Sequence, residues 1–335
     1  METELYIKSG NIVVRLDNAT PDVRSLIYER FDGYFRITES LADTKPARTI
    51  KLIESSGLLI KSTISAPSAE IKISNIFHDH DNPEVWIMLA QPTNDDSILE
   101  LHLINRTPAV CIMISRVIRS IILQLHFLQG KAFIHASAVS INGKVLAFTG
   151  PKYAGKTTCL LAMCKYTCAL PVTNDKLSIY YEGSHPQAQG FPIKAGIRRG
   201  ALDLIDEDGL FNTDKMFSHD SDKVLRVTMH ELARKFNKFP AHSGPLAAIC
   251  LPIYDSSLEG FSISRYSSFE ITGAWKDNQL KSLAEIDPEQ KAIANFFPQH
   301  YDSNTIPEVP VFLCRSNSGS IKAMVEYLEQ LVRTL

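Results

Sequence analysis

The segment from Phe148 to Ala162, FTGPKYAGKTTCLLA, has the residue types and spacing of a phosphate-binding loop and fits G-x-x-x-x-G-K-[ST] at every fixed position. In such a loop the glycines let consecutive backbone amides point at phosphate oxygens, and the following helix presents its positive N-terminal end. The lysine reaches the β and γ phosphates, and the hydroxyl after it ligates Mg²⁺. The alternative is a glycine-rich turn without a ligand. The pattern predicts nucleotide binding by nine residues: Gly150, Pro151, Lys152, Tyr153, Ala154, Gly155, Lys156, Thr157 and Thr158.

A nucleotide site also needs an acidic group that holds the metal or takes up a proton, and the next apolar segment supplies one. Asn174 and Asp175 interrupt the strand-like run ALPVTNDKLSIYY. An acid at the end of a strand beside the loop can share Mg²⁺ with Thr157 or accept the proton of an attacking hydroxyl. The alternative is a plain β-turn at Asn174 and Asp175.

The segments that flank the loop are the elements that must position it. The apolar run KVLAFT precedes the loop, and the apolar run TTCLLAMCK follows it as a predicted helix. Upstream, the strand-like run KAFIHASAVS is separated from VLAFTG by a turn that contains Asn142 and Gly143. Asn-Gly between two such runs is a strong hairpin signal. The strand that enters the loop is therefore predicted to be one arm of an antiparallel hairpin.

The rest of the chain predicts an α/β fold with α+β character, in which a β-rich region, 1–105, precedes the domain that carries the loop, 106–335. An antiparallel set of strands is indicated by LYIKSGNIVVRL, GYFRIT, TIKLIES, LLIKSTIS, EVWIMLA and ILELHLI. The apolar segment from Ala109 to Leu128 is predicted to be a buried helix, because Arg116 and Arg119 would be costly in lipid. A last amphipathic helix, from Ser320, is expected to dock on the fold.

Composition places the chain among globular proteins and offers no general partner. Hydrophobic residues make up 44% and charged residues 21% of 335 residues, and the net charge is -2. We therefore expect no nucleic acid and no membrane partner. The N-terminus lacks the apolar core of a signal peptide, so a cytoplasmic location is expected. The six cysteines are interpreted as small buried hydrophobes, the alternative being a metal site.

The order of these features resembles the kinase domain of the HPr kinase/phosphorylase family, which is related to phosphoenolpyruvate carboxykinase and includes proteins encoded beside ribosomal peptide pathways. The resemblance covers 133–200 most specifically: HASAV, hairpin, phosphate loop, helix, an acid-containing strand, GFP and an Arg-Gly pair. It implies ATP and Mg²⁺ as cofactors and a mixed sheet. It also implies a role for His135 near the phosphates and for Arg198 and Arg199 near phosphate or substrate.

The chain departs from that family at two places. The family usually shows two acids where Asn174 and Asp175 stand. Asp175 alone is therefore expected to act as the base or the metal ligand here, and Asn174 is expected to contact the substrate. Lys152, Tyr153 and Ala154 stand where relatives often carry Ser-Gly.

The resulting hypothesis is an ATP-dependent kinase that acts on a Ser or Thr hydroxyl of a peptide or small protein, such as a ribosomal peptide precursor. Lys156, Asp175 and His135 are its predicted catalytic residues, and relatives that form dimers or rings suggest a homo-oligomer. Three alternatives stay open: a kinase for a small hydroxylated metabolite, a nucleotide-sensing protein or ATPase without an acceptor, and a scaffold that binds no nucleotide.

Overall fold

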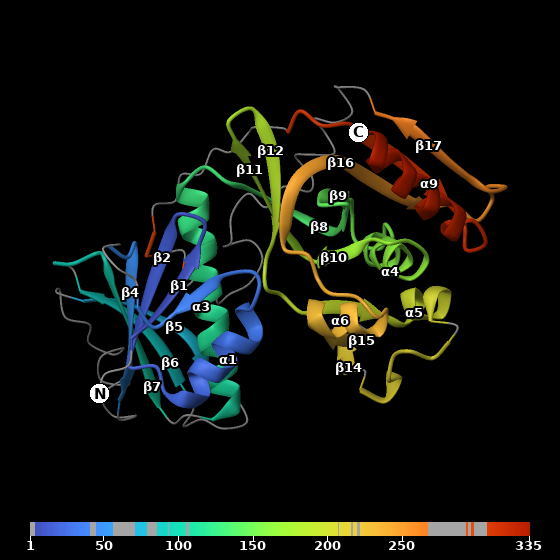
Figure 1. Ribbon diagram of the computed structural model, residues 1–335. Helices are drawn as coiled ribbons and strands as arrows, with labels where there is room; N and C mark the ends of the chain where they lie inside the picture. Colours follow the sequence, from blue (N-terminus) through green and yellow to red (C-terminus); the bar gives the residue numbers. More distant parts are fainter. Residues whose placement is uncertain are drawn as a thin grey trace. The chain divides into compact units, whose positions relative to one another are not determined.

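The computed structural model describes residues 4–40, 45–55, 71–78, 86–92, 94–104, 107–206, 208–215, 217–219, 222–266, 293, 296–297 and 307–335. The chain forms two compact units (Figure 1). The first comprises Met1–Gly130 and a later segment within 281–303, and the second comprises Lys131–Leu280 and Asn304–Leu335.

The first unit is built on a seven-stranded mixed sheet with the order β3-β1-β2-β4-β7-β6-β5. Its strands are β1 (Leu5–Ser9), β2 (Ile12–Asp17), β3 (Arg36–Thr38), β4 (Arg48–Glu54), β5 (Ile71–His78), β6 (Trp86–Pro92) and β7 (Ile98–Ile104). Among its described residues the helices are α1 (Pro21–Phe31) and α3 (Pro108–Leu128). Alternate residues of β1 and β2, such as Leu5, Ile7, Val14 and Leu16, are fully buried.

The antiparallel arrangement that the sequence predicts for this region is wrong in part, because β2 pairs with β4 and β4 pairs with β7 in parallel. Parallel neighbours need a crossover connection, and α1 lies in the connection between β2 and β4. The helix α1 is absent from the strands predicted for this region, although Pro21 at its first position and Asp22 in its first turn are helix-start signals. The predicted strand LLIKSTIS lies outside the described residues.

The predicted apolar helix is confirmed as α3, which contacts α1 and β2 of the first unit. Among the described helices it is one that by length and composition could cross a membrane, yet 72% of its most apolar window is buried inside the protein. Its packing explains the division of the chain. The sequence-based boundary near residue 105 lies before α3, whereas the compact units divide after Gly130.

The second unit contains an eight-stranded mixed sheet with the order β10-β8-β11-β12-β16-β18-β17, in which β9 pairs with both β8 and β16. Its strands are β8 (Ala132–Ile141), β9 (Lys144–Thr149), β10 (Leu170–Thr173), β11 (Lys176–Glu182), β12 (His185–Gly190), β16 (Ser243–Tyr254), β17 (Phe261–Arg265) and β18 (Val311–Ser316). A smaller antiparallel sheet comprises β13 (Ala195–Arg198), β14 (Phe217–His219) and β15 (Asp222–Val227). The helices that the structure describes in this unit are α4 (Lys156–Tyr166), α5 (Arg199–Ile205), α6 (Met229–Lys235) and α9 (Ile321–Thr334), with a 3₁₀ turn at Thr213–Lys215.

The predicted hairpin before the loop is confirmed. β8 and β9 pair antiparallel from Ile141 opposite Lys144 to Ala136 opposite Thr149. Asn142 and Gly143 form the turn with φ of 50° and 82°, the left-handed values that a two-residue type I′ turn requires. On its other edge β9 pairs in parallel with β16. The strand that delivers the loop is therefore hydrogen-bonded on both sides and rigidly placed.

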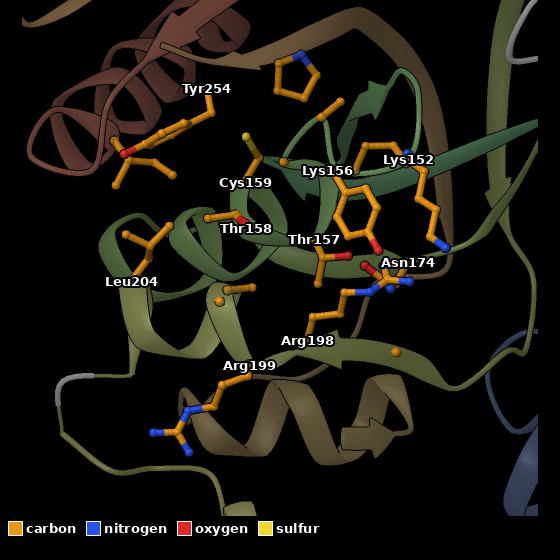
Figure 2. Close-up of a pocket in the computed structure, with 18 of the residues that line it drawn as sticks. Lys152, Lys156, Thr157, Thr158, Cys159, Asn174, Arg198, Arg199, Leu204 and Tyr254 are labelled. Atoms are coloured by element: carbon orange, nitrogen blue, oxygen red, sulfur yellow. The ribbon is translucent and has the colours of Figure 1, made fainter. Parts of the chain in front are cut away.

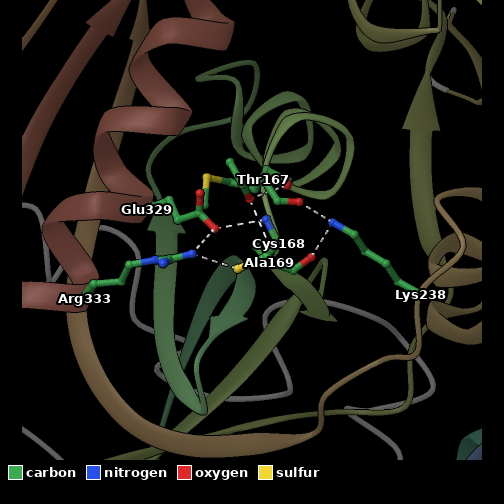
Figure 3. Close-up of polar contacts among 7 residues, drawn as sticks. Thr167, Cys168, Ala169, Lys238, Glu329 and Arg333 are labelled. Atoms are coloured by element: carbon green, nitrogen blue, oxygen red, sulfur yellow. Dashed lines mark hydrogen bonds and ion pairs between the residues drawn. The ribbon is translucent and has the colours of Figure 1, made fainter.

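Polar side chains from distant segments hold the far end of α4, as Figure 3 shows. The Lys238 ammonium donates hydrogen bonds to the carbonyl oxygens of Cys164 at 2.7 Å, Thr167 at 2.5 Å and Ala169 at 3.0 Å. Glu329 of α9 accepts a hydrogen bond from the Cys168 amide at 3.0 Å. Carbonyls that a helix C-terminus leaves without an intrahelical partner thus find partners in the tertiary structure. The predicted docking helix is confirmed as α9, and it packs on α4.

Candidate functional site

The predicted phosphate loop connects the end of β9 to the start of α4. Gly150 and Gly155 lie at its ends with φ of 144° and 97°, in the region that favours glycine. A Cβ on Gly150 would also stand 3.2 Å from the Cβ of Ala154, so the loop needs glycine there on two grounds. The backbone therefore explains both glycines of the motif.

Lys156 begins α4 and its side chain turns back along the loop. It is only 8% exposed, and its ammonium donates to the carbonyl oxygens of Gly150 at 2.7 Å and Pro151 at 2.9 Å. Burial lowers the pKa of Lys156 to about 8, an effect opposed by the Asp175 carboxylate and reinforced by Arg198. Ser137 of β8 donates to the Lys156 carbonyl oxygen at 2.6 Å. The ammonium is thus held beside the loop by partners that a buried charge requires.

Tyr153 stands at the exposed tip of the loop in a conformation unusual for its type. Its φ is 71°, which is uncommon for an aromatic residue and costs conformational energy. The Arg198 guanidinium lies 4.9 Å from the centre of its ring and the Lys152 ammonium 5.3 Å from it. Two cations, those of Lys152 and Arg198, therefore lie close to the Tyr153 ring at the loop.

His135 and Asp175 are in direct contact. β10 and β11 both pair with β8, and Asn174 and Asp175 form the bend between these two strands. The register sets Lys176 opposite His135, which brings its neighbour Asp175 to the histidine. The distance from His135 Nδ1 to Asp175 Oδ1 is 3.0 Å, and both side chains are partly exposed. The two residues form a histidine–carboxylate pair.

The Asn174 side chain is almost wholly buried, at 9% exposure. Its Oδ1 has no hydrogen-bond partner among the described residues. A buried oxygen without a partner is costly, and this residue lines the pocket described next. The site therefore offers an acceptor oxygen that a ligand could satisfy.

A pocket of about 800 Å³ brings these groups together (Figure 2). Of the predicted site residues, all line it except Gly150 and Pro151, whose carbonyls hold Lys156: the lining set is His135, Lys152, Tyr153, Ala154, Gly155, Lys156, Thr157, Thr158, Asn174, Asp175, Arg198 and Arg199. In Figure 2 Arg198 points toward Thr157 and Asn174, whereas Arg199 points away from them. Arg199 pairs instead with Asp203 at 2.7 Å on α5.

The pocket also contains residues that the sequence analysis did not single out. Lys194 and Arg226 add positive charge, and Leu204, Tyr254 and Ile321 add apolar surface. The alternation of polar and buried residues in KAGIR, 194–198, is a strand signal that marks Lys194 and Arg198 as one face. The apolar lining comes from three separate elements and has no local signal.

Comparisons with known proteins identify no family for this chain. No protein-family model matches it, and no curated protein matches it significantly. Among solved structures it is similar to the HPr(Ser) kinase/phosphatase from Coxiella burnetii, at 10% sequence identity and a TM-score of 0.29, over 60% of this chain and 94% of that chain. A likeness this distant establishes neither a shared fold nor a shared activity.

Proposed function

We propose that the second unit is an ATP-dependent kinase of the HPr kinase-like type, which transfers the γ-phosphoryl group to a hydroxyl of a peptide or protein. One observation carries the proposal: the loop lysine and the His135–Asp175 pair line the same pocket. A site that only bound nucleotide would need the loop but no acid–base pair. An acid–base pair beside it serves a reaction in which a proton must leave.

The two sides of the pocket suit the two ends of a nucleotide. Lys156 and the start of α4 offer positive charge to the phosphates. In Figure 2 Leu204 and Tyr254 lie on the other side of Thr158 from Asn174 and Lys152. Their apolar surface suits a base, with Ile321 of α9 completing it. The phosphate chain would therefore run past Thr158 and Thr157 toward His135 and Asp175.

The oxygen atoms beside the loop fit Mg²⁺. The Thr157 hydroxyl, the Asp175 carboxylate and the Asn174 amide oxygen are hard ligands of the kind this ion takes, and the Asn174 oxygen is buried without a protein partner. These three residues would hold the ion. Bound there, Mg²⁺ would neutralise charge on the β and γ phosphates.

The acid–base pair defines where the proton goes. An ionised carboxylate can only accept, so His135 Nδ1 donates to Asp175 and leaves Nε2 as the acceptor of the neutral ring. As the acceptor oxygen bonds to the γ-phosphorus and the bond to the β-phosphate oxygen breaks, the hydroxyl proton passes to His135. Asp175 keeps the ring oriented and stabilises the cation that forms. Lys156 stabilises charge on the transferred group.

Transfer of radiolabelled γ-phosphate from ATP, with a screen of hydroxyl acceptors, tests this function. Lys156→Ala removes the phosphate contact, and we expect turnover to fall by about 10²-fold or more. Lys144→Ala, at the first residue of β9, the strand that leads into the loop, is the matched control and should retain activity. Phosphate release at one rate whatever acceptor is added would identify an ATPase instead.

Asp175→Asn separates binding from chemistry. We expect this variant still to bind nucleotide, read as a melting shift with ATP and Mg²⁺, although more weakly because Mg²⁺ loses a charged ligand. Transfer should be lost, because an amide cannot hold the histidine in the required tautomer. An unchanged transfer rate would remove Asp175 from the mechanism. Absence of any melting shift in the wild type would favour a scaffold without nucleotide.

A further inference from the structure

The small sheet β13-β15-β14 presents a basic face to the pocket. Gly196 of β13 stands opposite Arg226 of β15, and Arg198 stands opposite Val224. Residues opposite each other, and residues two apart, share one face of an antiparallel pair. Lys194, directly before β13, continues that alternation, and all five residues line the pocket: Lys194, Gly196, Arg198, Val224 and Arg226. We call Lys194, Arg198 and Arg226 the basic face.

The opposite side of the same strand pair is core. Ala195, Ile197, Leu225 and Val227 are all buried. The register of the two strands is therefore fixed by burial, because a shift of one residue would turn these apolar side chains outward. The same register aims the basic face into the pocket. The placement of Arg198 and Arg226 is therefore set by the pairing of β13 and β15.

The basic face extends beyond the phosphate loop. Arg198 adjoins the loop, since its guanidinium lies over the Tyr153 ring at 4.9 Å from the ring centre. An extended chain rises about 3.3 Å per residue, which puts Lys194, directly before β13, about 13 Å from Arg198. Gly196 lies between them and has no side chain, so space opens beside Arg226 across the pair. A Cβ there would meet Val224 Cγ1 at an ordinary 3.5 Å. The fold does not require glycine at this position, yet the absent side chain leaves room for a ligand.

The balance of charge exceeds what one nucleotide needs. Among the described residues that line the pocket, six are basic and one, Asp175, is acidic: the basic residues are Lys152, Lys156, Lys194, Arg198, Arg199 and Arg226. The loop, Lys156 and the N-terminus of α4 already serve the phosphates of a magnesium-bound nucleotide. Cations concentrated in one pocket raise the local concentration of anions. Arg199 pairs with Asp203, and the three cations of the basic face suit a second anionic group.

We propose that the basic face binds an anionic group of the phosphoryl acceptor, a carboxylate or a phosphate, next to the hydroxyl that reacts. This inference rests on the proposed kinase function and names the chemistry of its substrate. Arg198 lies between the loop and the distal pair, Lys194 and Arg226, so the anion would be anchored by that pair. Arginine and lysine bind both kinds of oxyanion by charge-assisted hydrogen bonds. The acceptor hydroxyl would then be held toward His135 and Asp175, which line the same pocket.

The test fills the nucleotide site first, so that a second anion cannot occupy the place of the γ-phosphate. The protein is saturated with the magnesium complex of β,γ-imido-ATP and titrated calorimetrically with matched probes. N-acetyl-L-serine is compared with its neutral amide, and glycerol 3-phosphate with glycerol. We expect at least one anionic probe to bind about tenfold tighter than its neutral partner. The pair of probes that shows this preference indicates whether the anionic group of the acceptor is a carboxylate or a phosphate.

Variants assign the preference to the basic face. Lys194→Gln and Arg226→Gln should each abolish most of the preference while the nucleotide analogue still binds. Arg265→Gln, an exposed residue of β17, should leave the preference unchanged. The inference is overturned if neither anionic probe is preferred, or if the preference survives in either variant. Failure of the analogue itself to bind the wild type is a separate result, which would overturn the proposed function and with it this inference.

Discussion

At Lys156, burial lowers the pKa of the ammonium group, whereas hydrogen bonding favours its charged form. Removal from water lowers its pKa to about 8, while the carbonyl oxygens of Gly150 and Pro151 give the charged form partners. The group is therefore a cation near neutral pH, but only by a small margin. A bound triphosphate would favour the charged form, because it adds negative charge beside it. Proton uptake and phosphate binding are thus linked at one residue.

That linkage predicts how affinity depends on pH. Below pH 8 most molecules already carry the Lys156 cation. Above pH 8 the free lysine is neutral and must take up a proton, so affinity for the magnesium complex of β,γ-imido-ATP should fall, by up to about tenfold per pH unit. Calorimetric titrations at pH 7, 8 and 9 measure this fall in affinity.

Lys156→Arg is the control for the pH profile, because a guanidinium stays charged over this range. Whatever its affinity, that variant should lose the pH dependence between 7 and 9. A flat profile in the wild type would show that Lys156 is not the titrating group at the phosphates.

At the scale of elements, α4 is fixed at both ends by segments that are far away in sequence. Its first residue is held through the Ser137 contact from β8, in which the hydroxyl donates to a backbone carbonyl. Its last turn is held by Lys238, which follows α6, and by Glu329 of α9 (Figure 3). The helix that presents Lys156 and Thr157 to the pocket therefore cannot shift without breaking several contacts.

Lys238→Met tests the C-terminal support. The change keeps an apolar stem of similar length and removes the donor to three carbonyl oxygens. We expect the free energy of unfolding to fall by about 1–3 kcal/mol, because carbonyls lose a charged partner in a partly buried place. Urea denaturation monitored by circular dichroism measures the loss. Lys235→Met, an exposed lysine of the neighbouring α6, should change it by less than half as much. Equal effects of the two substitutions would contradict the role of Lys238.

At the scale of the whole molecule, the chain carries two compact units, and every described group of the candidate site belongs to the second. The first unit has its own mixed sheet and its own apolar helix, α3, and no described residue of it lines the pocket. A ligand that binds one unit stabilises that unit by mass action. The two units should therefore respond differently to nucleotide.

Hydrogen–deuterium exchange gives the measurement for this difference. Saturating β,γ-imido-ATP with Mg²⁺ should slow exchange in the loop 150–155 and in α4, since local opening there must now release the ligand. Peptides from β1 and β2 should exchange at unchanged rates. Protection of β1 and β2 equal to that of the loop would show that the first unit takes part in binding.

Much of the site's local geometry was readable from the sequence, because it is encoded in contiguous residues. Gly150 and Gly155 are required by left-handed backbone at fixed spacing, and Asn142 and Gly143 form the hairpin turn that their types predict. The signals that start helix α1 are also local, with Pro21 at its first position, but the helix was not predicted because the region was interpreted as strands only. Strand direction was not local: parallel pairs in the first unit depend on a crossover that no alternation pattern reveals.

The sequence by itself determined a loop, a hairpin and a list of polar residues able to act on phosphate. Only the tertiary structure decided which of them meet. His135 and Asp175 are forty positions apart and touch because β8 and β11 pair in one register. Of two adjacent arginines, Arg198 faces the loop and Arg199 pairs with Asp203, since the chain passes from β13 into α5 between them. The basic face joins two strands whose pairing is fixed by burial of their other side. Short-range spacing specifies backbone conformation, whereas the meeting of distant side chains is set by the register of the sheets and by packing of their cores.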